Sequence, residues 1–457
     1  MVCRLPAPAP ILQGSVTPQK EAPLIDLIPF RRQSKMSAMR SFELKYGAEK
    51  IAINVPKEQI ISVLSGRHML PLRDPLSAIW AALQEPIDTP PLKQVIKKSE
   101  RVAIIVSDFT RATKADLFLP VLVDQLNEIG IPDKDIFIVF GNGTHPFHTR
   151  EKQEQIVGKE IANRIQMFDH DCRDETNLIS LGKTSRGTPF KVNKKFYEAD
   201  RKILTGSITY HYFAGFGGGR KAILPGISGF ETIQTNHRLS MRPECTTAAL
   251  DNNPLSLDME EAAKMVKPDF ILNTVLNENK EICGVFAGDL MAAHRAGCQF
   301  INEYAMVRID RKAELVIAAA GGGGMDMNYV QSHKAMENAS FALKEGGVMI
   351  LLAEAAEGFP SEVYLKYINL GSAQSIHDEL ERNFTIPGHT VYATLFKSEK
   401  FKIIWVSKLP KEIVRKMKIT PADSFEEAYA LANQWLPGNP STYVVPLAYT
   451  TFPVMSG

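Results

Sequence analysis

Short apolar runs alternate with amphipathic stretches along most of the chain from about residue 100 onward. The run RVAIIVSD precedes a helical pattern over residues 114–128, and DIFIVFGNGTH follows that pattern. β-Branched runs of this length, alternating with helix-length amphipathic segments, are typical of β-α-β units. The pattern therefore predicts an α/β fold with a mostly parallel sheet covered by helices on both faces.

The same alternation continues toward the C-terminus and predicts a second sheet. KILTGSITY, a helix over residues 255–265, FILNTVL and a helix over residues 289–304 complete the first set of elements. A second set begins with a strand at residues 316–320 and a helix at residues 331–343, and the runs GGVMILLAEA, FKIIWVSK and TYVVPLA follow as strands. Two sets of this kind predict two α/β domains.

The change from a helical pattern to a charged segment near residues 303–311 sets the expected domain boundary. A first domain of residues 37–305 and a second of residues 306–445 then enclose an active-site cleft, and residues 446–457 are expected to pack back on the first domain. The length of 457 residues suits two or three domains. Residues 1–36 are rich in proline and show no periodicity, so they are predicted to form a disordered tail.

Composition narrows the classes of partner. The 53 basic and 51 acidic residues leave a net charge of +2, which gives no electrostatic reason to expect nucleic acid or an anionic membrane as partner. The five cysteines contain no CxxC pair, and no apolar run is long enough to span a bilayer. We therefore expect a cytoplasmic protein that acts on a small molecule. The sequence leaves the oligomeric state open.

Polar and glycine-rich clusters follow four of the predicted strands. SDFTR follows the first strand, GNGTH the second, a glycine-rich segment follows KILTGSITY, and a tetraglycine at residues 321–324 follows the first strand of the second domain. Ligands of open α/β sheets bind beyond the carboxyl ends of the strands, so these clusters are expected to build one site.

The glycine-rich segment, residues 211–237, reads HYFAGFGGGRKAILPGISGFETIQTNH and matches neither a regular helix nor a regular strand. It is no Walker loop, because no Ser or Thr follows Lys221, and no dinucleotide fingerprint, because Arg220 stands where the third glycine belongs. A flexible turn with a solvated Arg-Lys pair is the alternative. We expect three of its glycines to let the backbone approach a bulky ligand: Gly217, Gly218 and Gly219.

Three histidines in these clusters are candidates for chemistry. Imidazole titrates near neutral pH, so His145 and His211 on opposite sides of one substrate carbon could alternate as acid and base, as a racemase requires. Each could equally be an ordinary turn or core residue. His145 and His148 form an HxxH pair, but Pro146 and the loop setting argue against zinc. His237 could be the only protein ligand of a metal whose other ligands come from a cofactor, or a histidine on a helix surface.

The combined motifs resemble the lactate racemase family, whose members use a nickel-pincer nucleotide. HYFAGFGGGRKAILPG followed by NH, with SDFTR, GNGTH and QSHK, carries the resemblance over about residues 40–455. The resemblance implies that Lys221 joins the cofactor through a thioamide, that His237 ligates nickel, and that His145 and His211 are the acid/base pair. It also implies supporting roles for four polar residues, two at the cofactor and two at the substrate: Asp108 and Arg111, and Gln331 and Lys334.

The implied reaction is racemisation of a 2-hydroxy acid by proton-coupled hydride transfer from Cα to the cofactor, through a 2-oxo acid. The family pattern has an aromatic residue immediately before the glutamine that matches Gln331, whereas this chain has Val330. A larger or more apolar acid than lactate is therefore expected, with lactate still within the expected range. Cofactor-synthesis enzymes are the implied maturation partners. The alternatives are an NAD-dependent 2-hydroxy acid dehydrogenase, whose glycine fingerprint is missing, and a non-catalytic binding homologue.

Overall fold

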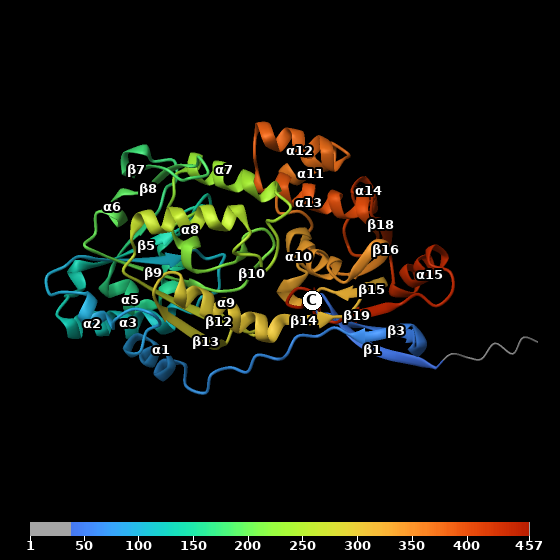
Figure 1. The fold of residues 1–457 in the computed structure, drawn as a ribbon, viewed down its shortest axis with the longest axis horizontal. Coiled ribbons are helices and arrows are strands. Elements are labelled where there is room, and N and C mark those ends of the chain that lie inside the picture. Colours follow the sequence, from blue (N-terminus) through green and yellow to red (C-terminus); the bar gives the residue numbers. More distant parts are fainter. Residues whose placement is uncertain (1–37, 457) are drawn as a thin grey trace, which may run out of the picture. The chain divides into compact units, whose positions relative to one another are not determined.

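A computed structural model describes residues 38–456 of the chain (Figure 1). The predicted disordered tail, residues 1–36, lies outside the described residues. The described residues belong to one compact unit that contains two six-stranded sheets. The α/β fold with mostly parallel sheets is thereby confirmed. No helix of the described part is long and apolar enough to cross a membrane.

The first sheet has the strand order β13-β12-β9-β4-β5-β6, and all its neighbouring strands are parallel except β12 and β13. Strand β4, near the middle of this sheet, is an almost continuous apolar run, as expected for a strand that is covered on both faces. Its six strands are β4 (Val102–Ser107), β5 (Ile136–Gly141), β6 (Gln166–Asp169), β9 (Arg201–Ser207), β12 (Phe270–Leu276) and β13 (Ile282–Gly288).

Helices cover both faces of this sheet, and alternate residues of β4 enter two different cores. Val102 and Ile104 pack with α1 and α3 on one face, whereas Ala103 and Ile105 pack with α8 on the other. The helices of this part are α1 (Pro75–Gln84), α2 (Leu92–Val95), α3 (Ala115–Ile129), α4 (Arg150–Val157), α5 (Lys159–Arg164), α6 (Lys194–Tyr197), α7 (Phe230–Arg238), α8 (Pro254–Val266) and α9 (Ala292–Ala305). A small antiparallel pair, β7 (Leu178–Lys183) and β8 (Pro189–Asn193), lies apart from the main sheet.

The second sheet is entirely parallel, with the order β18-β17-β16-β15-β19-β3. Its strands are β3 (Ile60–Val63), β15 (Ala313–Ala319), β16 (Leu343–Leu352), β17 (Lys402–Val406), β18 (Thr420–Ala422) and β19 (Thr442–Val445). The predicted helix after β15 is α10 (Tyr329–Ser340), which ends earlier than expected because Leu343 already begins β16.

The N-terminal strands belong with this second sheet rather than with the first. β3 pairs with β19 at its edge, and the hairpin of β1 (Met39–Tyr46) and β2 (Glu49–Pro56) contributes Leu44 and Ile53 to the core on the same side as α15 (Phe425–Trp435). The predicted first domain, residues 37–305, included β1, β2 and β3. Pairing between segments so far apart leaves no mark in a local hydrophobic pattern, and the boundary near residue 305 stays a prediction.

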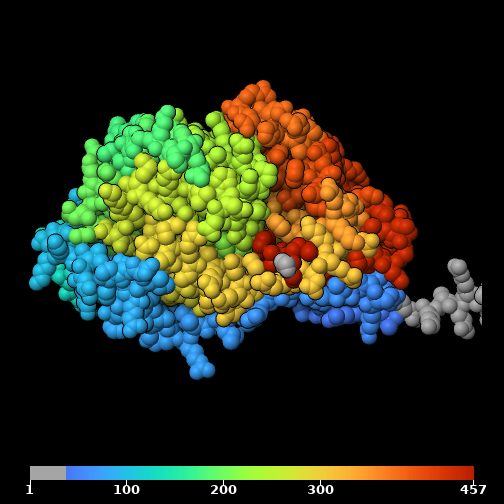
Figure 2. All heavy atoms as spheres, in the orientation of Figure 1, coloured from blue at the N-terminus to red at the C-terminus, as the bar shows by residue number. Residues whose placement is uncertain are grey.

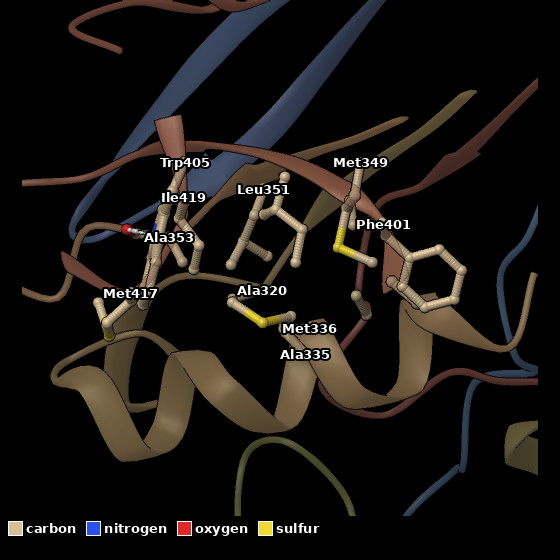
Figure 3. Close-up of a cluster of buried hydrophobic side chains, with 14 of the residues drawn as sticks. Ala320, Ala335, Met336, Met349, Leu351, Ala353, Phe401, Trp405, Met417 and Ile419 are labelled. Carbon is tan, nitrogen blue, oxygen red and sulfur yellow. Dashed lines mark hydrogen bonds between the residues drawn. The ribbon is translucent and has the colours of Figure 1, made fainter. Parts of the chain in front are cut away.

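The other face of the second sheet is covered by α10 together with α11 (Val363–Ile368), α12 (Ala373–Arg382), α13 (Ile386–Lys400) and α14 (Lys411–Lys416). Figure 3 shows the contact: Met336 of α10 lies against Met349 and Leu351 of β16, with Trp405 of β17 beside them. These side chains are buried, and the indole Nε1 of Trp405 donates to the carbonyl of Ala353 at 2.9 Å. This packing fixes α10 relative to the sheet.

The last described residues return to the junction between the two sheets. β20 (Phe452–Met455) pairs in parallel with β14 (Met306–Ile309), and the ring of Phe452 lies 5.4 Å from that of Tyr210, which follows β9. In Figure 2 these residues, dark red, lie at the surface between residues coloured yellow and orange. The end of the chain therefore contacts the strand region that carries His211.

Candidate active site

The carboxyl ends of three neighbouring strands bring the first group of candidate residues together. Asp108 and Arg111 follow β4, His145 follows β5, and His211 lies on β10 (Tyr210–His211) just after β9. Because β9, β4 and β5 are adjacent and parallel, these segments meet at one edge of the sheet. The strand-end rule therefore predicted their common location correctly.

His211 is surrounded by basic groups. Burial lowers its pKa far below the usual range, and Lys221, Arg111, Lys334 and His237 add to this effect, in that order. Its ring stacks on that of Tyr212 at 5.4 Å between centroids, and its Nδ1 accepts a hydrogen bond from the backbone N–H of Ala214 at 3.3 Å: both neighbours lie in the same hairpin. His211 is therefore a neutral imidazole at pH 7 with its hydrogen on Nε2.

Lys221 lies in the short 3-10 helix η4 (Gly219–Ala222), and its side-chain Nζ forms no hydrogen bond or ion pair with any described residue. Its Nζ is 5.7 Å from the centroid of the Phe213 ring. Burial lowers its pKa well below the usual range, and the charges of Arg111 and Arg220 lower it further. The site thus favours the neutral amine, which is the nucleophilic form of lysine.

His237 lies on α7, which begins at Phe230. The last third of the glycine-rich segment is therefore helical, contrary to the expectation that it would be irregular. The His237 side chain is buried with 2% exposed, its Nδ1 has no hydrogen-bond partner in the described part of the chain, and burial, Lys221 and His389 lower its pKa to about 3. The backbone of Ile233 acts against this shift without outweighing it, so His237 is a neutral imidazole and is not on a helix surface.

Among residues 38–456, no group of three or more His, Cys, Asp or Glu side chains is placed to hold a metal ion. His145 and His148 each contact their own carboxylate, Asp108 and Asp169 respectively, through Nδ1. A metal at His237 would take its remaining ligands from a bound cofactor.

His145 is more open than His211, with 41% of its side chain exposed, and Asp108 holds its Nδ1. Burial raises the pKa of Asp108, but the hydrogen bond and charge of His145, with Thr110 and Arg111, outweigh burial and keep that pKa below its usual value. The carboxylate fixes the hydrogen of His145 on Nδ1 and leaves Nε2 as a free acceptor. Arg111 links the two histidines electrostatically, since its charge acts on both Asp108 and His211.

Gln331 and Lys334 lie on α10, and Tyr449 joins them from the end of the chain. The Nζ of Lys334 donates to Gln331 Oε1 at 2.9 Å and to the Tyr449 hydroxyl at 3.0 Å, and that hydroxyl donates to Gln331 Oε1 at 3.1 Å. Sequence reasoning missed Tyr449, which follows none of the strand-end motifs. Tyr329 is fully buried and hydrogen bonds to Thr394 at 2.5 Å, so it points away from this group.

The three central glycines are required by packing inside the protein. A Cβ at Gly218 would lie 2.6 Å from Oδ1 of Asn273, and one at Gly219 would lie 2.7 Å from Cδ2 of His294. Gly218 and Gly219 also have φ values of +71° and +51°, and at Gly217 the Cβ would lie 3.3 Å from a backbone oxygen. The expected reason for these glycines, space for a ligand, is therefore replaced by close packing; their contact with a cofactor stays a prediction.

Helix α13 adds two residues that the sequence gave no reason to select. The Tyr212 hydroxyl and Thr390 Oγ1 are 3.2 Å apart, and the ring of His389 lies 5.2 Å from that of Phe213. His389 is buried, and its Nδ1 has no partner among the described residues. These contacts connect the hairpin that carries His211 with the helices of the second sheet.

Two cavities adjoin the candidate residues. One, partly open to solvent, is lined by Tyr212, Lys334 and Tyr449 among others. Another, more open to solvent, is lined by His145 and Arg173 among others. Neither has Lys221 or His237 in its lining, so the two cavities flank the most buried part of the site.

Comparison with known proteins gives a consistent result over nearly the whole chain. Residues 46–248 match the lactate racemase N-terminal domain, and residues 309–449 match the lactate racemase C-terminal domain. The chain is 31% identical over 427 residues to the lactate racemase of Thermoanaerobacterium thermosaccharolyticum, covering 89% of this chain and 98% of the relative. It is 33% identical over 358 residues to the lactate racemase of Lactiplantibacillus plantarum, covering 76% and 83%.

Solved structures agree with these relatives. The lactate racemase apoprotein of T. thermosaccharolyticum superimposes with a TM-score of 0.84 at 30% identity, over 92% of this chain and all of that chain. A Thermotoga maritima protein matches with a TM-score of 0.61 at 18% identity, over 83% of this chain and 98% of its own, which shows a shared fold alone.

The fold, the strand-end site and these relatives define an enzyme, specifically a racemase and so an isomerase. The family follows from the extent of the matches, which include both domain types and more than two thirds of each named relative. The chain belongs to the lactate racemase family.

Proposed function

We propose that the protein racemises a 2-hydroxy acid by proton-coupled hydride transfer, using a nickel-pincer nucleotide tethered to Lys221. The observation that carries this proposal is the convergence of Arg111, Lys221, His237 and Lys334 on His211, each of which lowers the pKa of its imidazole. The two cations of this group, Arg111 and Lys334, suit anionic ligands, here a mononucleotide cofactor and the carboxylate of the substrate, whereas Lys221 and His237 are available in their neutral forms.

Lys221 and His237 have the properties that the tether and the nickel ligand need. The site favours the neutral amine of Lys221, and His237 is a neutral imidazole whose buried Nδ1 has no hydrogen-bond partner among the described residues. Borderline and soft ligands such as imidazole and thiolate suit nickel. When bound, the cofactor supplies a pyridinium ring that accepts and returns the Cα hydride of the substrate. Asp108, Arg111 and the backbone at three glycines are the proposed support of this cofactor: Gly217, Gly218 and Gly219.

The two histidines are prepared for opposite halves of the proton transfer. Asp108 holds the hydrogen of His145 on Nδ1, so its Nε2 can accept the hydroxyl proton of the substrate. Ala214 donates to Nδ1 of His211, so the Nε2 of that ring presents a hydrogen. Inversion requires the 2-oxo acid to present its other face to the returning hydride. One histidine takes the hydroxyl proton, and the other, after it has taken up a proton as imidazolium, returns a proton to the same oxygen.

Lys334 and Gln331 are the proposed contacts of the substrate carboxylate. The ammonium group of Lys334 already has two polar partners, Gln331 and Tyr449, so its position is fixed before the substrate arrives. The named relatives are lactate racemases. In this chain Val330, immediately before Gln331, favours a larger or more apolar 2-hydroxy acid. Tyr449 supplies a hydroxyl beside the same pair from a different place in the chain. Initial rates with lactate, malate, phenyllactate and longer aliphatic acids distinguish the cases, and lactate as the best substrate would contradict the inference from Val330.

The experiment that tests the mechanism is intact mass and nickel content after co-expression with cofactor-synthesis enzymes, the proposed maturation partners. The wild-type protein should gain both mass and nickel, Lys221→Ala neither, and His237→Ala the mass with much less nickel. Lys202→Ala is the matched control, because Lys202 is also partly buried near the sheet but donates to Ala199 and should leave loading unchanged. A wild-type protein that gains neither would overturn the proposal.

A reducing, cytoplasmic location is part of the proposal. The four cysteines of the described part are free and buried. A nicotinamide-dependent dehydrogenase remains the competing enzyme class. Net oxidation of the substrate on addition of NAD, without nickel, would favour it.

A further inference from the structure

We propose that Arg220 is a positioning residue that holds the hairpin of His211 and the turn of Lys221 as one rigid unit before cofactor or substrate binds. The roles of His211 and Lys221 come from the proposed function; the part played by Arg220 goes beyond it. Arg220 lies in η4, next to Lys221, and only 1% of it is exposed. The alternative of a solvated Arg-Lys pair does not apply to this residue.

The guanidinium group of Arg220 reaches back to the strand opposite His211. Its Nη2 donates to the carbonyl of Ala214 at 2.8 Å and to that of Phe216 at 3.4 Å. These two residues flank Gly215, and Gly215 is the residue that pairs with His211 in the hairpin of β10 and β11 (Gly215–Phe216). One side chain therefore holds both ends of the strand that faces His211.

The glycine turn is held from the other side by buried polar groups of the sheet and of α9. Oδ1 of Asn273 accepts from the backbone N–H of Gly219 at 3.1 Å, and Nε2 of His294 donates to the carbonyl of Gly217 at 2.8 Å. Nη1 of Arg220 lies 3.0 Å from the same His294 nitrogen. The turn is thus held by contacts on two sides, and its backbone lies close against Asn273 and His294.

The charge of the buried Glu260 acts on Arg220, but only from beyond ion-pair distance. None of the described carboxylates forms an ion pair with it, and its Nε donates to a neutral group, Ser256 Oγ, at 3.1 Å. Burial of a charge without a paired opposite charge is costly, so retention of arginine here needs a reason. The reason is geometric: the planar fork bonds several acceptors on different segments at once, which a lysine cannot do.

The contacts of Arg220 with the hairpin, here called the clamp, act on His211 through Ala214. The carbonyl of Ala214 is bound by Arg220, while its N–H donates to Nδ1 of His211 and so sets which ring nitrogen carries hydrogen. Small displacements of catalytic groups reduce rates strongly, about 100-fold for 1 Å. The placement of His211 relative to Lys221 is accordingly set in the protein itself and does not depend on the ligand.

The test compares Arg220→Lys with Arg201→Lys in the full-length chain purified without cofactor. Arg201 lies at the amino end of β9 and bonds to Glu100 and Asp269 at 2.8 Å, so its replacement perturbs a bound arginine away from the turn. Amide hydrogen exchange over residues 214–222 should become at least about tenfold faster in Arg220→Lys and stay within about twofold in Arg201→Lys. In the loaded enzyme, Arg220→Lys should lower kcat at least about tenfold with KM within about threefold.

Wild-type exchange rates over this segment in Arg220→Lys, or an equal acceleration in Arg201→Lys, would overturn the proposal. If Arg220→Lys does not fold, Ser256→Ala decides, because it removes one acceptor of the guanidinium and leaves the charge in place. That variant should show exchange at least about threefold faster over the segment, and no change there would refute the clamp. Failure of the wild-type protein to take up nickel or racemise any 2-hydroxy acid would refute the proposed function and leave the exchange result to decide on Arg220.

Discussion

Replacement of Asp108 by asparagine reverses the hydrogen bonding of His145 while changing one atom. Oδ1 of Asp108 accepts from the backbone N–H of Thr110 at 3.1 Å and from its Oγ1 at 2.7 Å, while Oδ2 contacts Nδ1 of His145. In Asp108→Asn the carbonyl oxygen stays with the two Thr110 donors, and the NH2 group takes the position facing His145. An NH2 group only donates, so Nδ1 has to accept and the hydrogen of the neutral ring moves to Nε2.

The expected decrease in kcat follows from the loss of the proton acceptor at Nε2 of His145. A positioned acid or base contributes about 10²- to 10⁴-fold to a rate, so kcat should fall by that factor. This corresponds to about 3–5 kcal/mol, at about 1.4 kcal/mol for each tenfold. The two enantiomers of a substrate have equal free energies, so kcat/KM should fall equally in both directions. The fold should persist, because the amide has the size of the carboxylate.

Chiral chromatography of both enantiomers, with enzyme of measured nickel content, supplies the assay. Asp169→Asn is the matched control, because Asp169 contacts Nδ1 of His148 in the same way while the His148 side chain has no exposed surface. This control should lower the melting temperature and leave kcat within about threefold. Loaded Asp108→Asn with kcat within about threefold of wild type, or an equal loss in Asp169→Asn, would refute the role of the carboxylate in setting the tautomer.

Three further predictions concern packing, substrate binding and charge. Gly219→Ala should destabilise the protein by about 1–3 kcal/mol more than Gly323→Ala in chemical denaturation, because φ is +51° and +56° but the added Cβ meets a buried imidazole only at residue 219. Tyr449→Phe removes the hydroxyl 3.0 Å from Lys334 Nζ and should raise KM about 2- to 10-fold with kcat nearly unchanged, in steady-state kinetics. Lys221→Met should raise the melting temperature of the cofactor-free protein at pH 7, with a gain that shrinks as pH approaches 10.5, because the unfolded chain binds a proton there that the folded chain rejects.

Each of these has a contrary outcome. Equal losses of stability in the two alanine variants would show that backbone conformation alone requires Gly219. A Tyr449→Phe enzyme that lost kcat at constant KM would place this hydroxyl in the chemical step. A stability gain from Lys221→Met that did not change with pH would show that Lys221 is protonated in the folded protein.

Local patterns were sufficient for the elements themselves, because a buried parallel strand is a continuous apolar run. β4 and β5 are such runs, and the rule that ligands bind at carboxyl ends placed Asp108 and His145 at one edge. Local patterns do not determine which strands pair with each other. β3 joins β19 across most of the chain, and its hydrophobic pattern is the same whichever sheet it completes.

The same distinction between local pattern and tertiary packing applies to the residues of the site. Residues inside strand-end motifs were accessible to sequence reasoning, whereas Tyr449 and His389 reach the site through tertiary packing of the chain's end and of α13. The cluster of charge was also beyond the sequence: the pKa of His211 depends on how close Arg111 and Lys334 come, and they are far apart in the chain. Residues that are able to act as acids, bases or ligands can be selected from a sequence, but their electrostatic environment cannot be predicted from it.

The turn around Lys221 shows the physical reason most directly. A run of glycines is compatible with two opposite situations, a backbone that a ligand approaches and a backbone that the protein itself encloses. Which one holds depends on the direction of the absent Cβ, and at Gly218 and Gly219 that direction is occupied by the protein's own atoms. The same ambiguity applies to the two basic residues that follow: the guanidinium group of Arg220 donates to three acceptors inside the protein, while the Nζ of Lys221 has no polar partner among the described residues. The rigidity of Arg220 and the availability of Lys221 are therefore two results of one local geometry.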